Sequence, residues 1–268
     1  MMQNKFTILG SGTCISSSHK PFAIRYPSGY FLQFKKHNFL LDCSEGIKER
    51  LEKTKFDYYQ INRIFISHFH PDHFSLATFL QSIYVRIRKE NEKKEVIIYG
   101  PPKIEQRFEA MWDSMHNKGH YLNKFKNTIN ANFVEFKNQQ KIILDGDIQI
   151  TPYKVVHEDM DAFAMRFELK TKTICYSGDS GYSENLIEAA RNSDYFFCES
   201  TKDVGSEQNN LHLSPHSAGD IANKAGSKHL ILVHYHGTNS DEEMIKDVKK
   251  SGFSKQVTVG KDFQIFPI

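Results

Sequence analysis

Three histidines and an aspartate are concentrated in one short segment, Ser67-His68-Phe69-His70-Pro71-Asp72-His73, directly after the apolar run Ile64-Phe65-Ile66. Imidazole and carboxylate groups are the ligands that zinc and other first-row divalent cations bind. Alternate residues of an extended chain point to the same side, so His68 and His70 can converge on one ion. Asp72 and His73 follow Pro71, where the chain must bend, and can serve a second ion. The segment therefore predicts a metal site rather than an exposed polar turn.

Four more candidate residues stand where an apolar run stops, which is where loops project functional groups. They are Asp42, His157, Asp179 and His234, and Gly178 would let the backbone beside Asp179 approach an ion closely. One such residue alone is more often a surface or core-edge residue than a ligand. Four of them in the same chain as the histidine-rich segment favour a shared metal site.

Two further histidines have open roles. His236 lies two residues after His234 on the same face of an extended segment, so it rivals His234 for a ligand position. We prefer His234, because it follows the apolar run immediately. His212 precedes Ser214-Pro215, the expected start of a helix whose N-terminus attracts anions. His212 either binds a phosphate or protonates a leaving oxygen, or it only packs locally.

The elements that must position these residues are alternating strands and helices. Apolar runs predict strands at residues 5–9, 30–34, 39–42, 63–67, 96–99, 133–136, 148–156, 163–169, 172–177, 195–198, 229–233, 257–259 and 264–266. Helical patterns occupy residues 44–55, 74–88, 103–116, 183–191 and 214–225. Two strand-rich halves with interspersed helices indicate an α/β sandwich. No linker divides the chain, so a single domain over residues 1–268 is expected.

The composition is that of an ordinary globular domain, with 39% hydrophobic and 25% charged residues. The formal charge of +3 permits an anionic substrate, but there is no concentrated basic arm for nucleic acid. The N-terminal apolar stretch is too short for a signal peptide, and no stretch approaches membrane-spanning length. The cysteines lack a CxxC pair, so we expect reduced thiols in a cytoplasmic protein: Cys14, Cys43, Cys175 and Cys198.

The sequence resembles the metallo-β-lactamase-fold hydrolases, specifically their ribonuclease Z-like phosphodiesterase branch. The resemblance covers nearly the whole chain and rests on the HxHxDH segment with His157, Asp179 and His234 following in order. Further matching segments are Leu9-Gly10-Ser11-Gly12-Thr13, Asp42-Cys43-Ser44-Glu45-Gly46, Cys198-Glu199-Ser200-Thr201 and His212-Leu213-Ser214.

The resemblance implies an αββα sandwich with a dinuclear metal site at one edge of the two sheets. Zinc is the expected metal, with manganese or iron as alternatives. The implied ligands are His68, His70 and His157 for the first ion and Asp72, His73 and His234 for the second, with Asp179 bridging and Asp42 orienting a ligand. An aspartate at 179, where zinc β-lactamases have cysteine, argues against antibiotic hydrolysis.

Three features depart from the ribonuclease Z pattern. Ser44 stands where that family has glycine, and Pro71 where it usually has glycine. More importantly, only 21 residues separate His157 from Asp179. This leaves no room for the long arm with which bacterial ribonuclease Z grips tRNA, so a smaller phosphodiester is favoured.

The predicted function is therefore hydrolysis of a small or nucleotide-type phosphodiester by a metal-bridging hydroxide. We expect Asp72, Asp179 and His212 to take part in catalysis, with His212 protonating the leaving oxygen and Glu199 orienting His212. The alternatives are a tRNA 3′-processing endoribonuclease, with a partner subunit supplying the missing grip, a thioester or lactone hydrolase, and a metal-free scaffold. The expected partner is a small anionic phosphodiester. Binding of nucleic acid and formation of a homodimer are both possible, and no association with a membrane is expected.

Overall fold

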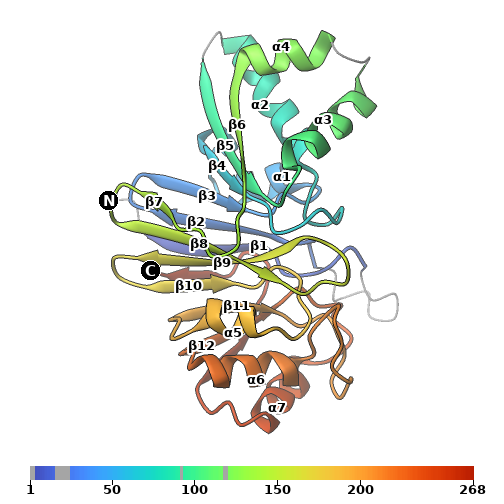
Figure 1. Cartoon of the computed structure of the whole chain (residues 1–268), viewed down its shortest axis with the longest axis vertical. Coiled ribbons are helices and arrows are strands. Elements are labelled where there is room, and N and C mark those ends of the chain that lie inside the picture. The colour runs from blue at the N-terminus through green and yellow to red at the C-terminus, as the bar shows by residue number, and fades with distance from the viewer. Residues whose placement is uncertain (1–3, 16–24, 91–92, 117–119) are drawn as a thin grey trace.

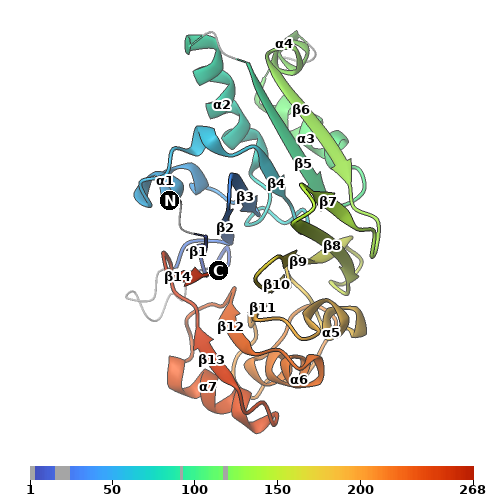
Figure 2. The same cartoon turned by 90° about the vertical axis from the view of Figure 1, so that its left-hand side faces the viewer.

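The computed structural model describes residues 4–15, 25–90, 93–116 and 120–268. In this part of the chain two seven-stranded sheets pack face to face, and helices cover the outer face of each sheet (Figure 1, Figure 2). This arrangement confirms the predicted αββα sandwich. No helix in the described ranges is long and apolar enough to cross a bilayer.

The first sheet has the strand order β14-β1-β2-β3-β4-β5-β6. It is antiparallel from β14 to β3 and parallel from β3 to β6. Its strands are β1 (Lys5–Gly10), β2 (Gly29–Phe34), β3 (His37–Leu41), β4 (Arg63–Phe65), β5 (Lys94–Gly100), β6 (Ile129–Glu135) and β14 (Ile265–Pro267). The helical elements of this half are α1 (Ile47–Lys53), η1 (Tyr58–Gln60), α2 (Leu76–Glu90), α3 (Ile104–Met115) and α4 (His120–Thr128).

The second sheet has the order β13-β12-β11-β10-β9-β8-β7 and repeats the pattern of the first. It is antiparallel from β7 to β10 and parallel from β10 to β13. Its strands are β7 (Ile142–Leu144), β8 (Ile148–Val155), β9 (Ala162–Leu169), β10 (Thr173–Tyr176), β11 (Tyr195–Glu199), β12 (His229–Val233) and β13 (Gln256–Val259). Its helices are α5 (Glu184–Ala190), α6 (Pro215–Ala225) and α7 (Asp241–Lys250).

Three buried apolar layers hold the four structural layers together. One lies between the first sheet and its helices, one between the two sheets, and one between the second sheet and its helices. Phenylalanine fills much of the middle layer, where Phe6 of β1 stacks on Phe197 of β11 with ring centroids 4.0 Å apart. Burial of such rings is a large contribution to stability. Phenylalanine is therefore a main component of the inter-sheet core, and further phenylalanines lie in the other two layers.

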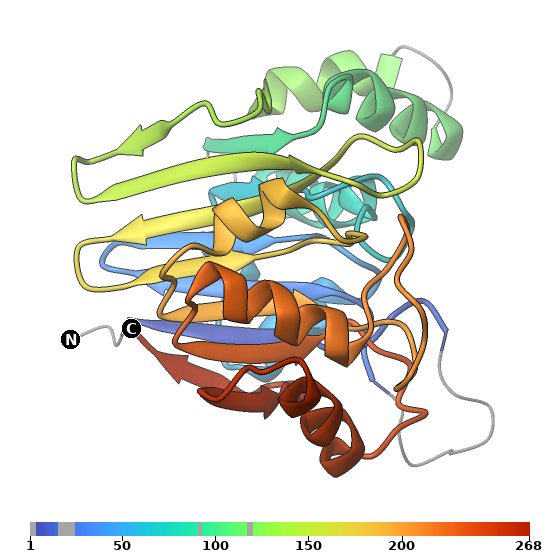
Figure 3. The ribbon, with the colours of Figure 1, turned by 60° about the horizontal axis from the view of Figure 1, so that its bottom comes forward.

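The carboxyl ends of the parallel strands meet at one edge of the sandwich, where loops gather (Figure 3). Asp42 follows β3 and His234 follows β12, and both have left-handed backbone angles, with φ of 56° and 51°. Such angles are uncommon for residues other than glycine and occur often at functional sites. Gly178 after β10 also has positive φ, and a Cβ there would lie 2.9 Å from Cβ of Ser67. A glycine at 178 therefore allows loops from the two sheets to approach closely.

Candidate metal centre

Loops after β4, β8, β10 and β12 bring the expected ligands into two adjacent groups. Within each group, one ligand atom from each residue lies within 4.8 Å of the others. All of these side chains except His70 are buried. The first group is His68, His70, His157 and Asp179, and the second is Asp72, His73 and His234.

The first group has the spacing of a metal coordination site. Nε2 of His68 lies 3.0 Å from Nδ1 of His70, and Nε2 of His157 lies 3.2 Å from the same Nδ1. Oδ2 of Asp179 is 3.6 Å from Nε2 of His68. Nitrogens bound at about 2.0–2.1 Å around a tetrahedral zinc ion stand about 3.3 Å apart. The donors and their separations therefore fit a divalent cation.

The second group has similar separations. Nε2 of His73 lies 3.2 Å from Nε2 of His234, and Oδ2 of Asp72 lies 3.4 Å from Nε2 of His234. Oδ1 of Asp179 lies 3.3 Å from Nε2 of His73 and 3.5 Å from Nε2 of His234. Asp179 thus directs one carboxylate oxygen toward each group, as a bridging ligand would.

The carboxylate of Asp179 provides the strongest test of this fit. It is 2% exposed, and among the described residues no donor hydrogen-bonds its Oδ1. Burial acts to raise the pKa of Asp179, but the neighbouring His234 and His73 outweigh it and hold the pKa well below the usual range. A buried, ionised oxygen without a donor is costly. A cation between the carboxylate and the imidazoles removes that cost.

The histidine rings are held in defined orientations by groups behind them. Nδ1 of His73 lies 2.7 Å from Oδ2 of Asp42 and donates to it, so Nε2 faces the group. Asp42 accepts three further hydrogen bonds, from the backbone nitrogen and hydroxyl of Ser67 and from the hydroxyl of Tyr176. Partners of this kind fix the tautomer of a ligating histidine. Asp42 is thus placed to orient the ring of His73.

His157 and His68 are oriented in the same manner. Nδ1 of His157 donates to the carbonyl of Leu211 at 2.8 Å. Nδ1 of His68 lies 3.0 Å from the Ser67 hydroxyl, which itself donates to Asp42 at 2.9 Å and therefore accepts from His68. Both rings consequently present Nε2 to the first group. Burial and the neighbouring His73 lower the pKa of His68 well below its ordinary value, which keeps the ring neutral as a ligand must be.

His73 has the opposite electrostatic environment. Burial acts to lower the pKa of His73, but the carboxylates of Asp179 and Asp42 outweigh it and raise the pKa well above the ordinary value. The carboxylates of Asp179 and Asp42 stabilise positive charge beside them, whether a proton or a metal ion carries it. They therefore also favour a metal cation at Nε2 of His73.

His212 and Glu199 form a pair beside the two groups. Nδ1 of His212 lies 2.8 Å from Oε1 of the buried Glu199. A ring nitrogen of His212 also lies within 4.8 Å of ligand atoms of Asp179 and His234. Burial acts to lower the pKa of His212, but the charge and hydrogen bond of Glu199 raise it to about 9. The pair can therefore present a proton from Nε2 toward the groups.

The structure separates the two rival histidines after β12. Nδ1 of His236 lies 2.9 Å from the hydroxyl of Thr13, whereas Nε2 of His234 faces the second group.

The residues near the two groups that we did not expect are mostly hydroxyl or backbone partners. One is the amide of Cys14, which donates to Oδ2 of Asp72 at 2.9 Å. A backbone donor leaves no mark in the sequence. Ser67, in contrast, could have been suspected because it directly precedes His68.

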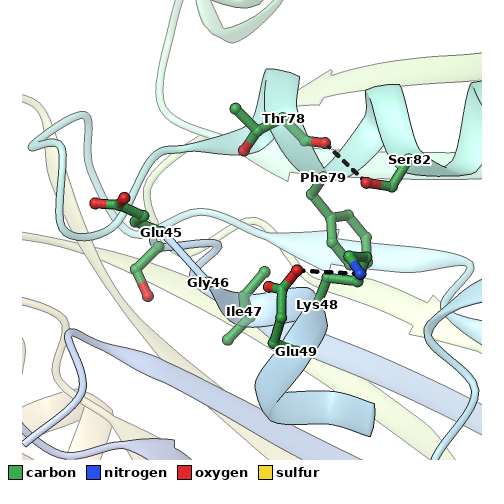
Figure 4. A pocket seen from close by; sticks show the side chains of 9 residues that line it. Glu45, Gly46, Ile47, Lys48, Glu49, Thr78, Phe79 and Ser82 are labelled. Atoms are coloured by element: carbon green, nitrogen blue, oxygen red, sulfur yellow. Dashed lines mark hydrogen bonds and ion pairs between the residues drawn. The ribbon is translucent and has the colours of Figure 1, made fainter.

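A surface pocket of about 350 Å³ lies between the start of α1 and the side of α2. Figure 4 shows the side chains that line it. Lys48 and Glu49 form an ion pair at its wall, and the Ser82 hydroxyl donates to the carbonyl of Thr78. None of its lining residues belongs to the two ligand groups. The pocket is therefore distinct from the candidate metal centre.

Comparisons with known proteins agree with this fold. The chain is 24% identical to ribonuclease Z of Methanothermobacter thermautotrophicus over 92% of this chain and 91% of that protein. It is also 24% identical to the probable metallo-hydrolase YhfI of Bacillus subtilis over 90% of this chain and 92% of that protein.

Solved structures show the same fold. The Bacillus subtilis metallo-β-lactamase fold protein YhfI superimposes with a TM-score of 0.79 at 22% identity, covering 98% of this chain and 99% of that one. The short form of human tRNase Z gives a TM-score of 0.74 at 21% identity over 98% and 99% of the two chains. Residues 4–260 match the family model described as "Anti-Pycsar protein Apyc1". The chain is thus a metal-dependent hydrolase of the metallo-β-lactamase fold, in its ribonuclease Z-like branch, and it belongs to the Anti-Pycsar protein Apyc1 family.

Proposed function

We propose that the protein is a phosphodiesterase that uses two divalent metal ions and acts on a small or nucleotide-type phosphodiester. The observation that carries the proposal is the carboxylate of Asp179, whose two oxygens face two separate groups of ligands. Zinc is the proposed metal because the donors are imidazole and carboxylate groups. Manganese and iron bind the same groups and are the alternatives. The free state of all four cysteines supports the proposed cytoplasmic location.

Two bound metal ions would activate a water molecule and neutralise charge on the phosphoryl group. The side chains of Asp72 and Asp179 orient the attacking water by accepting its hydrogen bonds. His212 carries a proton on Nε2 and donates it to the leaving oxygen, while Glu199 fixes the ring through Nδ1. Glu199 is itself held by the backbone amides of Ser180, Thr201 and Leu213.

The size of the substrate is proposed from the segment between His157 and Asp179. Strands β9 and β10 and their connecting turns occupy this segment, and the two strands pair with each other. A projecting arm for tRNA therefore has no place here. The similarity to proteins named ribonuclease Z keeps RNA cleavage as the second candidate. Cleavage of precursor tRNA would need a second copy of the chain to supply the surface that holds the tRNA.

A substrate panel with zinc-loaded or manganese-loaded protein tests the proposal. We expect kcat/KM for bis-p-nitrophenyl phosphate and for cyclic nucleotides to exceed the values for precursor tRNA, a thioester and a lactone. Zinc-stripped protein is the matched control. Efficient cleavage of precursor tRNA alone would favour the second candidate, and preferred hydrolysis of the thioester or lactone would contradict phosphodiesterase function.

A further inference from the structure

Thr201 lies two residues beyond the end of β11 and is buried against the last expected ligand, His234. Its hydroxyl oxygen Oγ1 is 2.7 Å from Nδ1 of His234 and 2.9 Å from the carbonyl oxygen of the same residue. One hydroxyl group therefore contacts both the ring and the backbone of His234.

These two contacts determine where the protons lie. A carbonyl oxygen can only accept, so the Thr201 hydroxyl must donate its proton to the carbonyl of His234. The hydroxyl oxygen is then an acceptor for the ring, so Nδ1 of His234 must carry a hydrogen. The neutral ring consequently has its lone pair on Nε2, which lies 3.2 Å from Nε2 of His73.

We propose that Thr201 is a positioning residue that holds His234 in the Nδ1–H tautomer and so presents the Nε2 lone pair to the metal centre. The proposal rests on the metal centre of the proposed function. It adds a role for a hydroxyl group that does not itself contact a metal or substrate.

The backbone of His234 makes this hydroxyl important. His234 has a φ of 51°, a conformation that side-chain-bearing residues adopt at an energetic cost. The Thr201 hydroxyl and the hydrogen bond from the amide of Ser200 to the carbonyl of Val233 hold this turn in place. The rings of His73 and His157 have a different kind of partner from the ring of His234. They donate to the carboxylate of Asp42 and the carbonyl of Leu211, and these groups can only accept a hydrogen bond.

Thr201 also connects His234 to the proposed proton donor. The amide of Thr201 donates to Oε2 of Glu199 at 3.1 Å, and Oε1 of Glu199 accepts from Nδ1 of His212. Residues 199–201 thus orient two histidines, His212 and His234, whose ring centroids lie 5.9 Å apart. Loss of the hydroxyl is expected to release the ring of His234 while leaving the pair of Glu199 and His212 intact, since that pair uses the Thr201 amide.

Thr201→Val removes the hydroxyl and retains a branched side chain of similar volume, and Thr201→Ser retains the hydroxyl. Thr258→Val is the matched control, because Oγ1 of Thr258 lies 2.8 Å from Nε2 of His229, at the other end of β12. His229 belongs to neither ligand group. The control therefore removes an equivalent threonine–histidine contact outside the centre.

The first measurement uses metal-free protein with ¹⁵N-labelled histidine. Long-range ¹H–¹⁵N spectra should show His234 as the Nδ1–H tautomer in the wild type and in Thr201→Ser, and as a mixture of tautomers in Thr201→Val. In the second measurement, zinc loss to a chelator should be about 10–100-fold faster for Thr201→Val than for the wild type, because partners behind a ligand contribute that much to metal affinity. Thr258→Val should match the wild type.

An unchanged tautomer together with unchanged zinc loss in Thr201→Val would overturn the role of Thr201. Equal acceleration in Thr258→Val would also overturn it, because the effect would then be general. These readouts do not depend on turnover. A wild-type protein that binds two zinc ions but cleaves no phosphodiester would therefore refute the proposed function and leave the role of Thr201 to be decided by the spectra and the zinc kinetics.

Discussion

Asp179 is a buried carboxylate surrounded by imidazole rings. Its carboxylate is buried and ionised, and its two oxygens face imidazole nitrogens from four histidines at distances of 3.3–4.0 Å. Isolated buried charges are strongly destabilising unless an opposite charge is close. Because its two oxygens face both ligand groups, the carboxylate of Asp179 could contact both cations of the proposed centre.

Asp179→Asn keeps the size of this side chain and removes its charge. We expect the zinc content to fall below two ions per chain and kcat/KM to fall about 100-fold or more, because both metal positions lose a charged ligand. Metal analysis of the purified variant, followed by kinetics at saturating zinc, measures this. Asp147→Asn, at an exposed residue paired with Lys35, is the control and should retain both properties. A variant with two tightly held zinc ions would contradict the bridging position.

His212→Ala tests the proposed proton donor. We expect kcat to fall by about 10²–10⁴-fold with two metal ions still bound, because the leaving oxygen loses its acid while the ligand groups stay intact. His216→Ala, at an exposed residue of α6, should have wild-type turnover. Unchanged kcat in a fully metallated His212→Ala protein would show that the leaving group needs no acid from this residue. Loss of a metal ion would identify His212 as a ligand instead.

At the scale of elements, all strands and helices that the sequence predicted overlap observed ones, but β7, η1, α4 and α7 were not expected. Strand β7 has only three residues, too few for an alternating pattern to be seen. Helix α7 did carry a signal, because Ser240 and Glu243 form a capping box at its start. Patterns of apolar residues thus predicted the strands well, and attention to capping residues would have added a helix.

The capping box of α7 makes a quantitative prediction. Ser240→Ala removes the hydroxyl that accepts from the amide of Glu243 at 3.2 Å. The free energy of unfolding should fall by about 1 kcal/mol, the usual contribution of an N-cap serine. Urea denaturation measures it, and Ser206→Ala in an exposed loop provides the comparison. A loss no larger than that of the loop variant would mean that the cap contributes nothing to stability.

The candidate site was more predictable than the partners that orient it. Strand ends converge at one edge of parallel sheets, so His157, Asp179 and His234 could be grouped from their positions after apolar runs. The contact between Thr201 and His234 depends on β11 and β12 being neighbours, which the spacing of residues along the chain does not reveal. The hydrogen bond from Tyr176 to Asp42 crosses from one sheet to the other. Such contacts follow only from the packed structure.

At the scale of the whole molecule, the proposed ligands come from both halves of the chain. His68, His70, Asp72 and His73 follow β4 of the first sheet, whereas His157, Asp179 and His234 follow strands of the second sheet. Bound metal ions would therefore tie the two sheets together at their common edge. A ligand that binds only the folded state stabilises that state in proportion to the logarithm of its concentration over Kd.

Metal removal should consequently lower the thermal stability of the whole protein. With free zinc about 1,000-fold above Kd, the linkage contributes about 4 kcal/mol for each bound ion, so removal of two ions with EDTA should lower the Tm by about 20 °C. Scanning calorimetry measures the change, and added zinc should restore the original Tm. A Tm that is insensitive to both chelator and zinc would contradict the presence of a metal centre between the two sheets.

Strand β14 pairs with β1, so the last strand of the chain completes the sheet that the first strand begins. Close by, Asp262 accepts hydrogen bonds from the amide and hydroxyl of Ser11 and from the amide of Tyr26. During synthesis on the ribosome, β1 is made early but must wait for residues 262–267 before its outer edge is covered. The loop whose Cys14 amide contacts Asp72 is fixed by the same late residues. Catalytic competence should therefore require that residues 262–267 have been synthesised, after most of the fold has formed.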